Sequence, residues 1–105
     1  MYARMTKFVG LLPERIDEAL ADFKERELAE LEGQEGFRGI MVLVDRPAGT
    51  AAALSMWEGE AQMKASERIA DRARESAVAL AKPERFPVVD HFEVVLQQMG
   101  HAASV

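Results

Sequence analysis

The sequence contains no cysteine and no asparagine. The absence of cysteine excludes disulfide bonds, zinc–thiolate centres and a thiol nucleophile. Zinc and iron sites without thiolates rely on imidazole ligands, and the chain has only two histidines, His91 and His101. We therefore expect no metal site.

Long apolar runs are absent as well. The run at residues 8–12 ends at Pro13, which makes it too short for the core of a signal peptide. No stretch approaches the ~18 apolar residues of a membrane-spanning helix. Together with the lack of cysteine, which suits a reducing compartment, these absences predict a cytoplasmic protein.

Basic residues are fewer than acidic residues. The chain has 13 lysines and arginines against 18 aspartates and glutamates, a formal net charge of −5. Nucleic-acid binders carry basic stripes, and anionic membrane surfaces attract basic segments, so we expect neither partner. A chain of 105 residues with 49% hydrophobic and 30% charged residues is typical of one globular domain. We place this domain at residues 1–96 and a C-terminal tail at residues 97–105.

Four segments have the composition and alternation of β-strands: residues 1–9, 37–45, 50–57 and 88–96. The middle two form a predicted hairpin, because Pro47 and Gly49 between them are typical turn residues. The third strand ends on the only tryptophan, Trp57. Alternation in the first strand places Arg4 and Thr6 on one face.

Two segments have helical spacing, residues 13–32 and 60–81. Pro13 suits the first position of a helix, and Gly33 is expected to end the first helix in a left-handed conformation. Glu27 interrupts the apolar stripe of the first helix. The second helix has an unusually small inward stripe, which would let it lie close to a sheet: Met63, Ile69, Ala70, Ala73, Ala77 and Leu80.

The order of these elements is β-α-β-β-α-β. That order predicts an α+β, ferredoxin-like fold with a four-stranded antiparallel sheet. Two helices can cover only one face of such a sheet, yet neighbouring strand residues such as Val42 and Leu43, or Val94 and Val95, are apolar on both faces. A second apolar face needs a cover. We therefore expect a homodimer in which two sheets face each other.

Several short motifs resemble a known family. They are Gly36-Phe37-x-Gly39 at the start of the second strand, Trp57-Glu58 at the end of the third, Val89-x-x-Phe92-Glu93-Val94-Val95 in the last, and the segment SMWEGEAQMKASE at residues 55–67. Over about residues 1–96 the chain resembles the antibiotic-biosynthesis-monooxygenase-like (ABM-like) branch of the dimeric α/β-barrel superfamily.

The resemblance implies a dimeric α/β barrel and two kinds of activity, cofactor-free oxidation of aromatic substrates or degradation of haem. The haem-degrading members use an asparagine on the first strand, the strand-end tryptophan and a histidine on the second helix. Only Trp57 carries over, because the chain has no asparagine and residues 60–81 have no histidine. The quinone-forming members use asparagine, tryptophan and tyrosine, and the single tyrosine here, Tyr2, lies at a different place. The resemblance therefore does not support haem degradation, and it implies no cofactor.

Four side chains are candidates for a ligand site: Trp57, His91, Arg4 and Thr6. Trp57 would stack on a flat ligand; the alternative is a core aromatic with its indole N–H on a backbone carbonyl. His91 would act as a general base, with Glu93 on its face; the alternative is a polar residue at the dimer seam or sheet edge. Arg4 and Thr6 would anchor an anionic or carbonyl group; the alternative for Arg4 is a charge that protects a strand edge.

Two hypotheses for function follow. The first is a binding protein, or a cofactor-free monooxygenase, for a small apolar or aromatic molecule. The second is a non-catalytic structural or regulatory homodimer whose interior is filled by its own side chains. A cavity of ~300 Å³ or more with convergent polar groups would favour the first, and a filled interior the second. Haem binding without the usual ligands is a third possibility, which a Soret band on titration would reveal.

Overall fold

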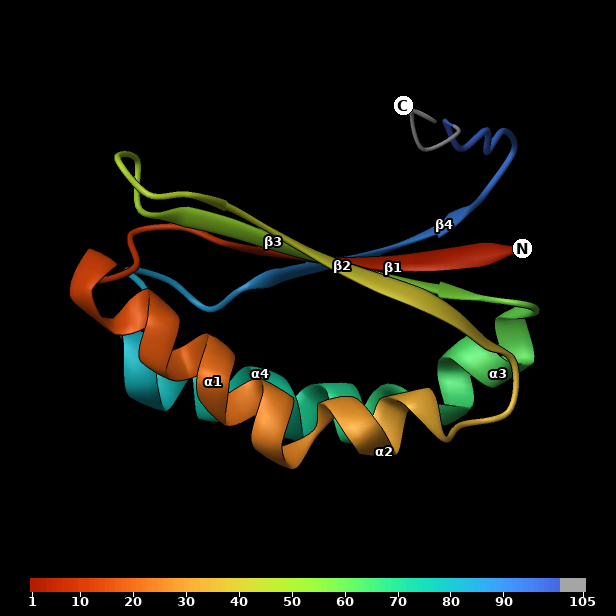
Figure 1. Cartoon of the computed structure of the whole chain (residues 1–105), viewed down its shortest axis with the longest axis horizontal. Coiled ribbons are helices and arrows are strands. Elements are labelled where there is room, and N and C mark those ends of the chain that lie inside the picture. Colours follow the sequence, from red (N-terminus) through yellow and green to blue (C-terminus); the bar gives the residue numbers. More distant parts are fainter. Residues whose placement is uncertain (101–105) are drawn as a thin grey trace, which may run out of the picture.

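The computed structural model describes residues 1–100, so His101 and the last part of the expected tail lie outside it. Within these residues the elements follow one another as shown in Figure 1: β1 (Tyr2–Phe8), the short 3-10 helix η1 (Pro13–Arg15), α1 (Ile16–Arg26), α2 (Leu28–Glu32), β2 (Phe37–Asp45), β3 (Thr50–Trp57), α3 (Glu60–Ala65), α4 (Glu67–Ala81) and β4 (Val88–Glu93). The hairpin strands begin and end where the sequence pattern predicts.

The four strands form one antiparallel sheet in the order β2-β3-β1-β4. β1 therefore lies in the interior of the sheet, with Arg4 opposite Ser55 of β3 and opposite His91 of β4. This arrangement is the ferredoxin-like α+β fold that the element order predicts. It also removes the alternative explanation for Arg4, because Arg4 does not lie on an edge strand.

All the helices pack on one face of the sheet, and the core lies between the two layers (Figure 1). Two clusters of buried residues fill its ends. One contains Leu31, Trp57, Met63 and Ile69. The other contains Leu11, Ile16 and Ala81. The middle of the layer, under α1 and α4, is less completely filled.

The opposite face of the sheet, here called the open face, has no helix over it (Figure 1). It carries large apolar side chains that are substantially exposed: Met41 is 43% exposed, Leu43 50% and Phe92 49%. The sheet is therefore apolar on both faces, as the sequence predicts. An apolar patch of this kind on a monomer is typical of an interaction surface.

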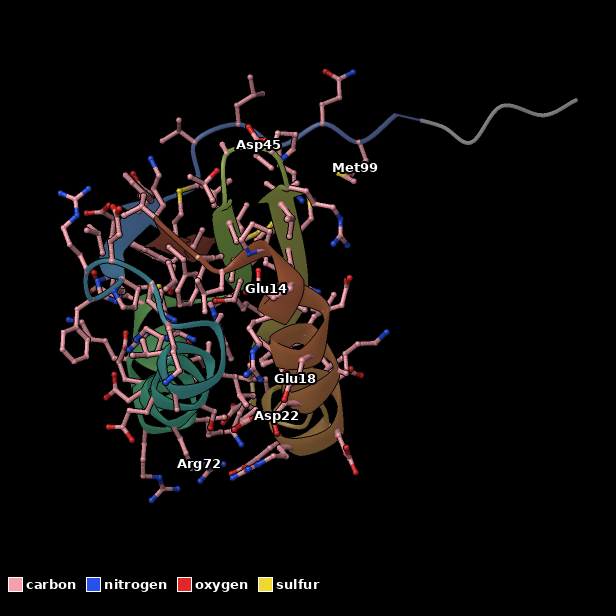
Figure 2. All side chains as sticks on the ribbon, turned by 90° about the vertical axis from the view of Figure 1, so that its left-hand side faces the viewer. Glu14, Glu18, Asp22, Asp45, Arg72 and Met99 are labelled. Carbon is pink, nitrogen blue, oxygen red and sulfur yellow. The ribbon has the colours of Figure 1, made fainter. Side chains whose placement is uncertain are left out.

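The outer surface of the helical layer is charged. Glu14, Glu18 and Asp22 follow one another along η1 and α1 (Figure 2). Arg46, in the hairpin turn, forms a two-point ion pair with Asp17 at 2.8 and 3.0 Å. This surface is a solvated face of the helical layer.

The expected helix at residues 60–81 is in fact two helices that meet at Ser66. The prediction of one continuous helix was wrong because the Ser66 hydroxyl donates to the carbonyl oxygen of Met63 at 2.7 Å. Serine side chains that bond to nearby backbone compete with regular helix formation. Ser66 is also completely buried, so its hydroxyl has no water to bond instead.

The expected helix at residues 13–32 is likewise divided, into η1, α1 and α2, with Glu27 at the junction of the last two. Gly33 is not left-handed, since its φ is −79°. The chain reverses instead at Gly36, where φ is +80°, and α4 ends at a left-handed Lys82 before Pro83.

The last strand ends at Glu93 rather than at residue 96. Its partner, β1, begins at Tyr2, so a strand that runs antiparallel to it has few residues left to pair with. One further hydrogen bond, from the Val94 amide to the Met1 carbonyl oxygen at 2.8 Å, closes the ladder. The predicted strand was too long because the alternation of apolar residues in the sequence continues beyond the last residue that can pair with β1.

Candidate functional site

A cavity of about 130 Å³ lies between the sheet and the helices. It exists because small side chains face each other across the layer, Ala51 and Ala53 from β3 and Ala73 and Ala77 from α4. Larger apolar side chains close its sides: Phe8, Ile16, Leu20, Phe23, Leu31 and Ile40. The small inward stripe predicted for the second helix thus leaves a space instead of a close helix–sheet contact.

Four polar side chains line the same cavity: Arg4, Thr6, Ser55 and Arg74. Arg4 and Thr6 come from β1, Ser55 from the neighbouring β3, and Arg74 from α4 above them. Arg74 Nη1 donates to the Thr6 hydroxyl at 3.5 Å. The cavity is therefore apolar over most of its wall and polar where β1 passes under α4.

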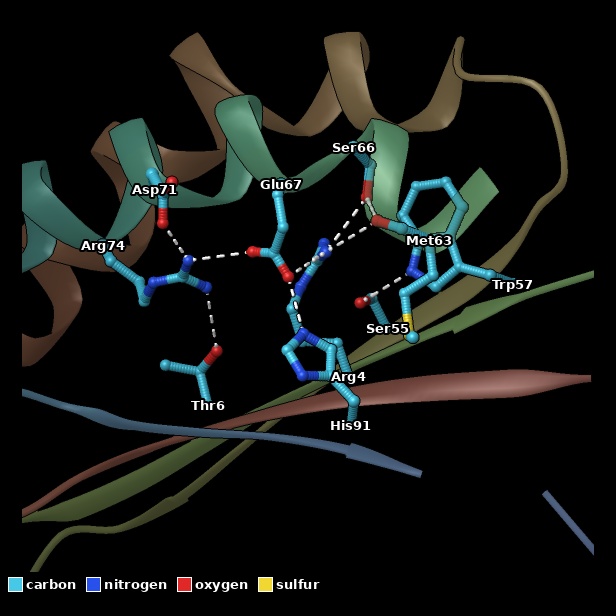
Figure 3. Close-up of polar contacts among 10 residues, drawn as sticks. All are labelled: Arg4, Thr6, Ser55, Trp57, Met63, Ser66, Glu67, Asp71, Arg74 and His91. Carbon is cyan, nitrogen blue, oxygen red and sulfur yellow. Dashed lines mark hydrogen bonds and ion pairs between the residues drawn. The ribbon is translucent and has the colours of Figure 1, made fainter. Parts of the chain in front are cut away.

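Arg4 is a charged side chain in an almost sealed position, only 3% exposed. Its Nη1 donates to the Met63 carbonyl oxygen at 3.2 Å and to the Ser66 hydroxyl at 3.0 Å, and it lies 3.3 Å from Glu67 Oε1 (Figure 3). Burial lowers the pKa of the Arg4 guanidinium, while the nearby Glu67 carboxylate opposes this. Arg4 stays a cation at neutral pH, because a guanidinium is not deprotonated in proteins.

Glu67, at the start of α4, connects three elements. Its carboxylate lies 2.6 Å from His91 Nε2 of β4 and 3.1 Å from Arg74 Nη2, in addition to Arg4 of β1 (Figure 3). Burial alone would raise the pKa of Glu67, but the hydrogen bond from His91 and the charges of Arg4 and Arg74 together lower it. Glu67 is therefore an ionised acceptor near neutral pH.

We call Arg4, Thr6, Ser66, Glu67, Arg74 and His91 the Arg4 cluster. Sequence reasoning found three of its members and missed the three that lie on or beside α4. For two of these three residues the sequence holds a signal. Glu67 and Arg74 lie four and eleven residues after Met63, which is the spacing of residues on one helical face, and so they continue the inward stripe. The partner of His91 is Glu67 and not Glu93, a contact that no local spacing predicts.

Trp57 is fully buried. Its indole N–H donates to the Ser55 hydroxyl at 2.9 Å, and its ring meets Phe37 edge-on at a centroid distance of 5.4 Å. The Arg4 guanidinium carbon lies 5.7 Å from the centre of the Trp57 ring, within cation–π range. Trp57 is thus a core residue that borders the Arg4 cluster. Its role as a stacking surface for a ligand stays a prediction.

Of the four candidate residues, the structure places Arg4 and Thr6 in the cavity wall. His91 is 45% exposed on its side chain and joins the cluster through Glu67. Its role as a general base also stays a prediction. Within residues 1–100, no group of three or more histidines and carboxylates is arranged to hold a metal ion.

Glu27 is a buried acid outside the Arg4 cluster, and sequence reasoning noticed it only as an interruption of a stripe. It is 1% exposed, and neither carboxylate oxygen has a hydrogen-bond partner among residues 1–100. Burial, followed by the charge of Asp22, raises its pKa. Glu27 flanks the cavity residues Phe23 and Leu31 in the helical stripe but does not itself line the cavity.

No family model matches the chain. Two curated relatives from Mycobacterium tuberculosis, the uncharacterized proteins Rv2557 and Rv2558, are 28% identical over 104 residues and 30% identical over 102 residues. These alignments cover 99% and 96% of this chain but only 45% and 42% of the relatives. The chain therefore spans less than half the length of the curated relatives it matches.

Solved structures match nearly the whole chain. The monooxygenase ActVA-Orf6 of Streptomyces coelicolor, solved with nanaomycin D, superposes with a TM-score of 0.76 at 13% identity, over 95% of this chain and 92% of that one. The chain has the fold of the ABM-like proteins. The same ABM-like fold occurs in the heme-degrader MhuD of Mycobacterium tuberculosis, with a TM-score of 0.64 at 19% identity over 94% of this chain and 100% of that one.

A dimeric ferredoxin-like protein from an uncultured marine organism also matches, with a TM-score of 0.71 at 9% identity over 95% of this chain and 92% of that one. At such identities the likeness establishes the ABM-like fold and leaves activity to the site itself. Within the described part of the chain, no helix is long and apolar enough to cross a membrane. The cytoplasmic location expected from the sequence stays a prediction.

Proposed function

We propose that this ABM-like chain is a binding protein for a small apolar molecule about the size of one aromatic ring. The observation that carries the proposal is the cavity of about 130 Å³ with apolar walls and a buried guanidinium at one end. An engineered apolar cavity of about 150 Å³ in another protein binds benzene. A few well-placed polar groups in an apolar cavity are the usual arrangement of a small-molecule site.

The size of the cavity limits the ligand. Drug-sized ligands occupy pockets of roughly 300–1,000 Å³, more than twice the volume available here. A polycyclic molecule or a haem would require the helical layer to move away from the sheet. This agrees with the sequence, in which the asparagine and histidine of the haem-degrading set have no counterpart.

Cofactor-free monooxygenation of the bound molecule is the finer form of this proposal. The fold of ActVA-Orf6 supports it, and so does a cluster that can hold a proton. His91 and the ionised Glu67 lie 2.6 Å apart beside Arg4. Here Arg4 and Thr6 would position the ligand against the apolar walls of the cavity.

The chain would act as a homodimer that buries the open face of each sheet. The support is the exposure of Met41, Leu43 and Phe92 on that face, together with the dimeric state of the marine ferredoxin-like protein. In a twofold interface the open face of one protomer would be covered by the open face of the other, so that neither remains exposed to water.

A structural or regulatory homodimer is the second candidate, and two observations favour it. Trp57, the residue expected to face a ligand, is packed in the core with its only donor bonded to Ser55. The cavity is also smaller than the range typical of ligand pockets.

Filling the cavity separates these candidates. Toluene is titrated into the protein, and binding is followed by ligand-observed NMR. In the variant Ala73→Met the new side chain would occupy the cavity, so toluene binding should fall at least tenfold. The control Ala65→Met lies on the exposed side of α3 and should bind like the parent protein. Absence of toluene binding by the parent, or equal binding by both variants, would exclude this cavity as the site.

A further inference from the structure

The Arg4 guanidinium has hydrogen-bond donors that the protein does not use. A guanidinium carries five N–H donors, yet all three neighbouring acceptors, on Met63, Ser66 and Glu67, contact the same nitrogen, Nη1. Within residues 1–100, the hydrogen bonds and the ion pair of Arg4 are made by Nη1, and none is made by Nε or Nη2. Because Arg4 is 3% exposed and lines the cavity, a group inside the cavity is well placed to satisfy them.

The two cations at this end of the cavity share one partly buried carboxylate, that of Glu67. Two guanidiniums line the cavity, Arg4 at 3% and Arg74 at 14% side-chain exposure. Among residues 1–100, Glu67 is the carboxylate in contact with both. Asp71, the second partner of Arg74, is 63% exposed and largely solvated. Asp71 compensates Arg74 from the solvent side, whereas an anion inside the cavity would be attracted by both guanidiniums that line it.

We propose that the natural ligand is a small apolar carboxylate, a monoanion with one ring-sized apolar body. Its carboxylate would accept hydrogen bonds from Arg4 Nε and Nη2 beside the Thr6 hydroxyl. Its apolar body would occupy the space between the alanines of β3 and α4. A planar carboxylate matches the fork of guanidinium donors, and such charge-assisted pairs are the stronger hydrogen bonds. This inference rests on the proposed function, because it needs a ligand in the same cavity.

The test compares three probes of nearly equal shape: benzoate, its neutral analogue benzamide, and toluene. The fluorescence of Trp57 reports binding, since it is the only tryptophan and its ring lies 5.7 Å from the Arg4 guanidinium, and calorimetry gives the affinities. Benzoate should bind at least tenfold more tightly than benzamide.

Variants identify the cations responsible. Arg4→Lys keeps the charge but removes the fork of donors, and it should weaken benzoate binding about tenfold while toluene binding stays within twofold. Because Arg4 is deeply buried, a second variant, Arg74→Met, provides an independent measure and should weaken benzoate binding in the same way. Arg72→Met is the control, because Arg72 lies on the same helix but pairs with Glu30 at the surface.

Equal affinity for benzoate and benzamide, with toluene still bound, would overturn the inference of an anionic ligand and leave the proposed function standing. An Arg72→Met variant that loses benzoate as strongly as Arg74→Met would also overturn it, because the effect would then be one of general surface charge. Failure of all three probes to bind would overturn both the inference and the proposed function.

Discussion

Arg4 and Ser66 are 62 positions apart in the sequence, and the Arg4 guanidinium donates to the Ser66 hydroxyl at 3.0 Å in the protein interior. The contact lies at the point where α3 ends and α4 begins. The break turns the Met63 carbonyl oxygen and the Ser66 hydroxyl toward β1, where both accept from Arg4. The irregularity of the helix and the buried cation thus stabilise each other.

Replacing Glu67 with glutamine should destabilise the protein. The change removes the charge that compensates Arg4 and Arg74, and the expected cost at pH 7 is about 1–3 kcal/mol in the free energy of unfolding. The pKa of Glu67 is lowered in the folded state. Its contribution to stability is therefore complete at pH values above the unfolded-state pKa of about 4.3, and it is lost as the pH falls through the folded-state pKa.

Urea unfolding from pH 7 to pH 3 measures this dependence. The difference between the parent and Glu67→Gln should shrink below about pH 4.3. Glu75→Gln, an exposed change on the same helix, is the control and should leave the stability nearly unchanged. A gap that stays constant down to pH 3 would show that the Glu67 charge does not stabilise the fold.

Replacing Glu27 with methionine should have the opposite effect and stabilise the protein. Both carboxylate oxygens of Glu27 are buried without a partner among residues 1–100, and methionine fills a similar volume without a charge. The expected gain at pH 7 is about 1–3 kcal/mol. The pKa of Glu27 is raised in the folded state. The ionised carboxylate therefore destabilises the fold in full at pH values above the folded-state pKa, and this destabilisation disappears as the pH falls toward the unfolded-state pKa of about 4.3.

Chemical unfolding at pH 7.5 and at pH 4 checks this prediction. Glu27→Met should be more stable than the parent at pH 7.5, with a smaller advantage at pH 4. Glu25→Met, at an exposed position two residues away, controls for a general gain from methionine in a helix. A destabilised Glu27→Met would mean that the carboxylate has a favourable role in the fold.

The proposed dimer can be tested with a matched pair of phenylalanines. Phe92 lies on the open face and is 49% exposed, whereas Phe86, in the loop before β4, is 82% exposed. Light scattering at micromolar concentration should give twice the chain mass of 11.6 kDa for the parent. Phe92→Asp would place a charge in the interface and should give the monomer mass, while Phe86→Asp should remain dimeric. A monomeric parent would contradict the argument from two apolar sheet faces.

The sequence by itself determined the hairpin of the sheet and the inward face of β1. Alternation of apolar residues predicts the strands at 37–45 and 50–57 with correct ends, and it places Arg4 and Thr6 on one face of β1. These features follow from the sequence because a strand's side chains alternate between faces whatever the rest of the chain does. The order of elements then leaves the ferredoxin-like arrangement as the expected fold.

Only the tertiary structure decided the site. The contact of Arg4 with Ser66, the pairing of His91 with Glu67, the cavity between facing alanines and the burial of Glu27 each depend on residues from different elements. Helical and strand periodicities describe neighbours along the chain, whereas these contacts join positions that are brought together only by packing of the two layers. For that reason the sequence named Arg4 and Thr6 but could not predict which groups they would meet.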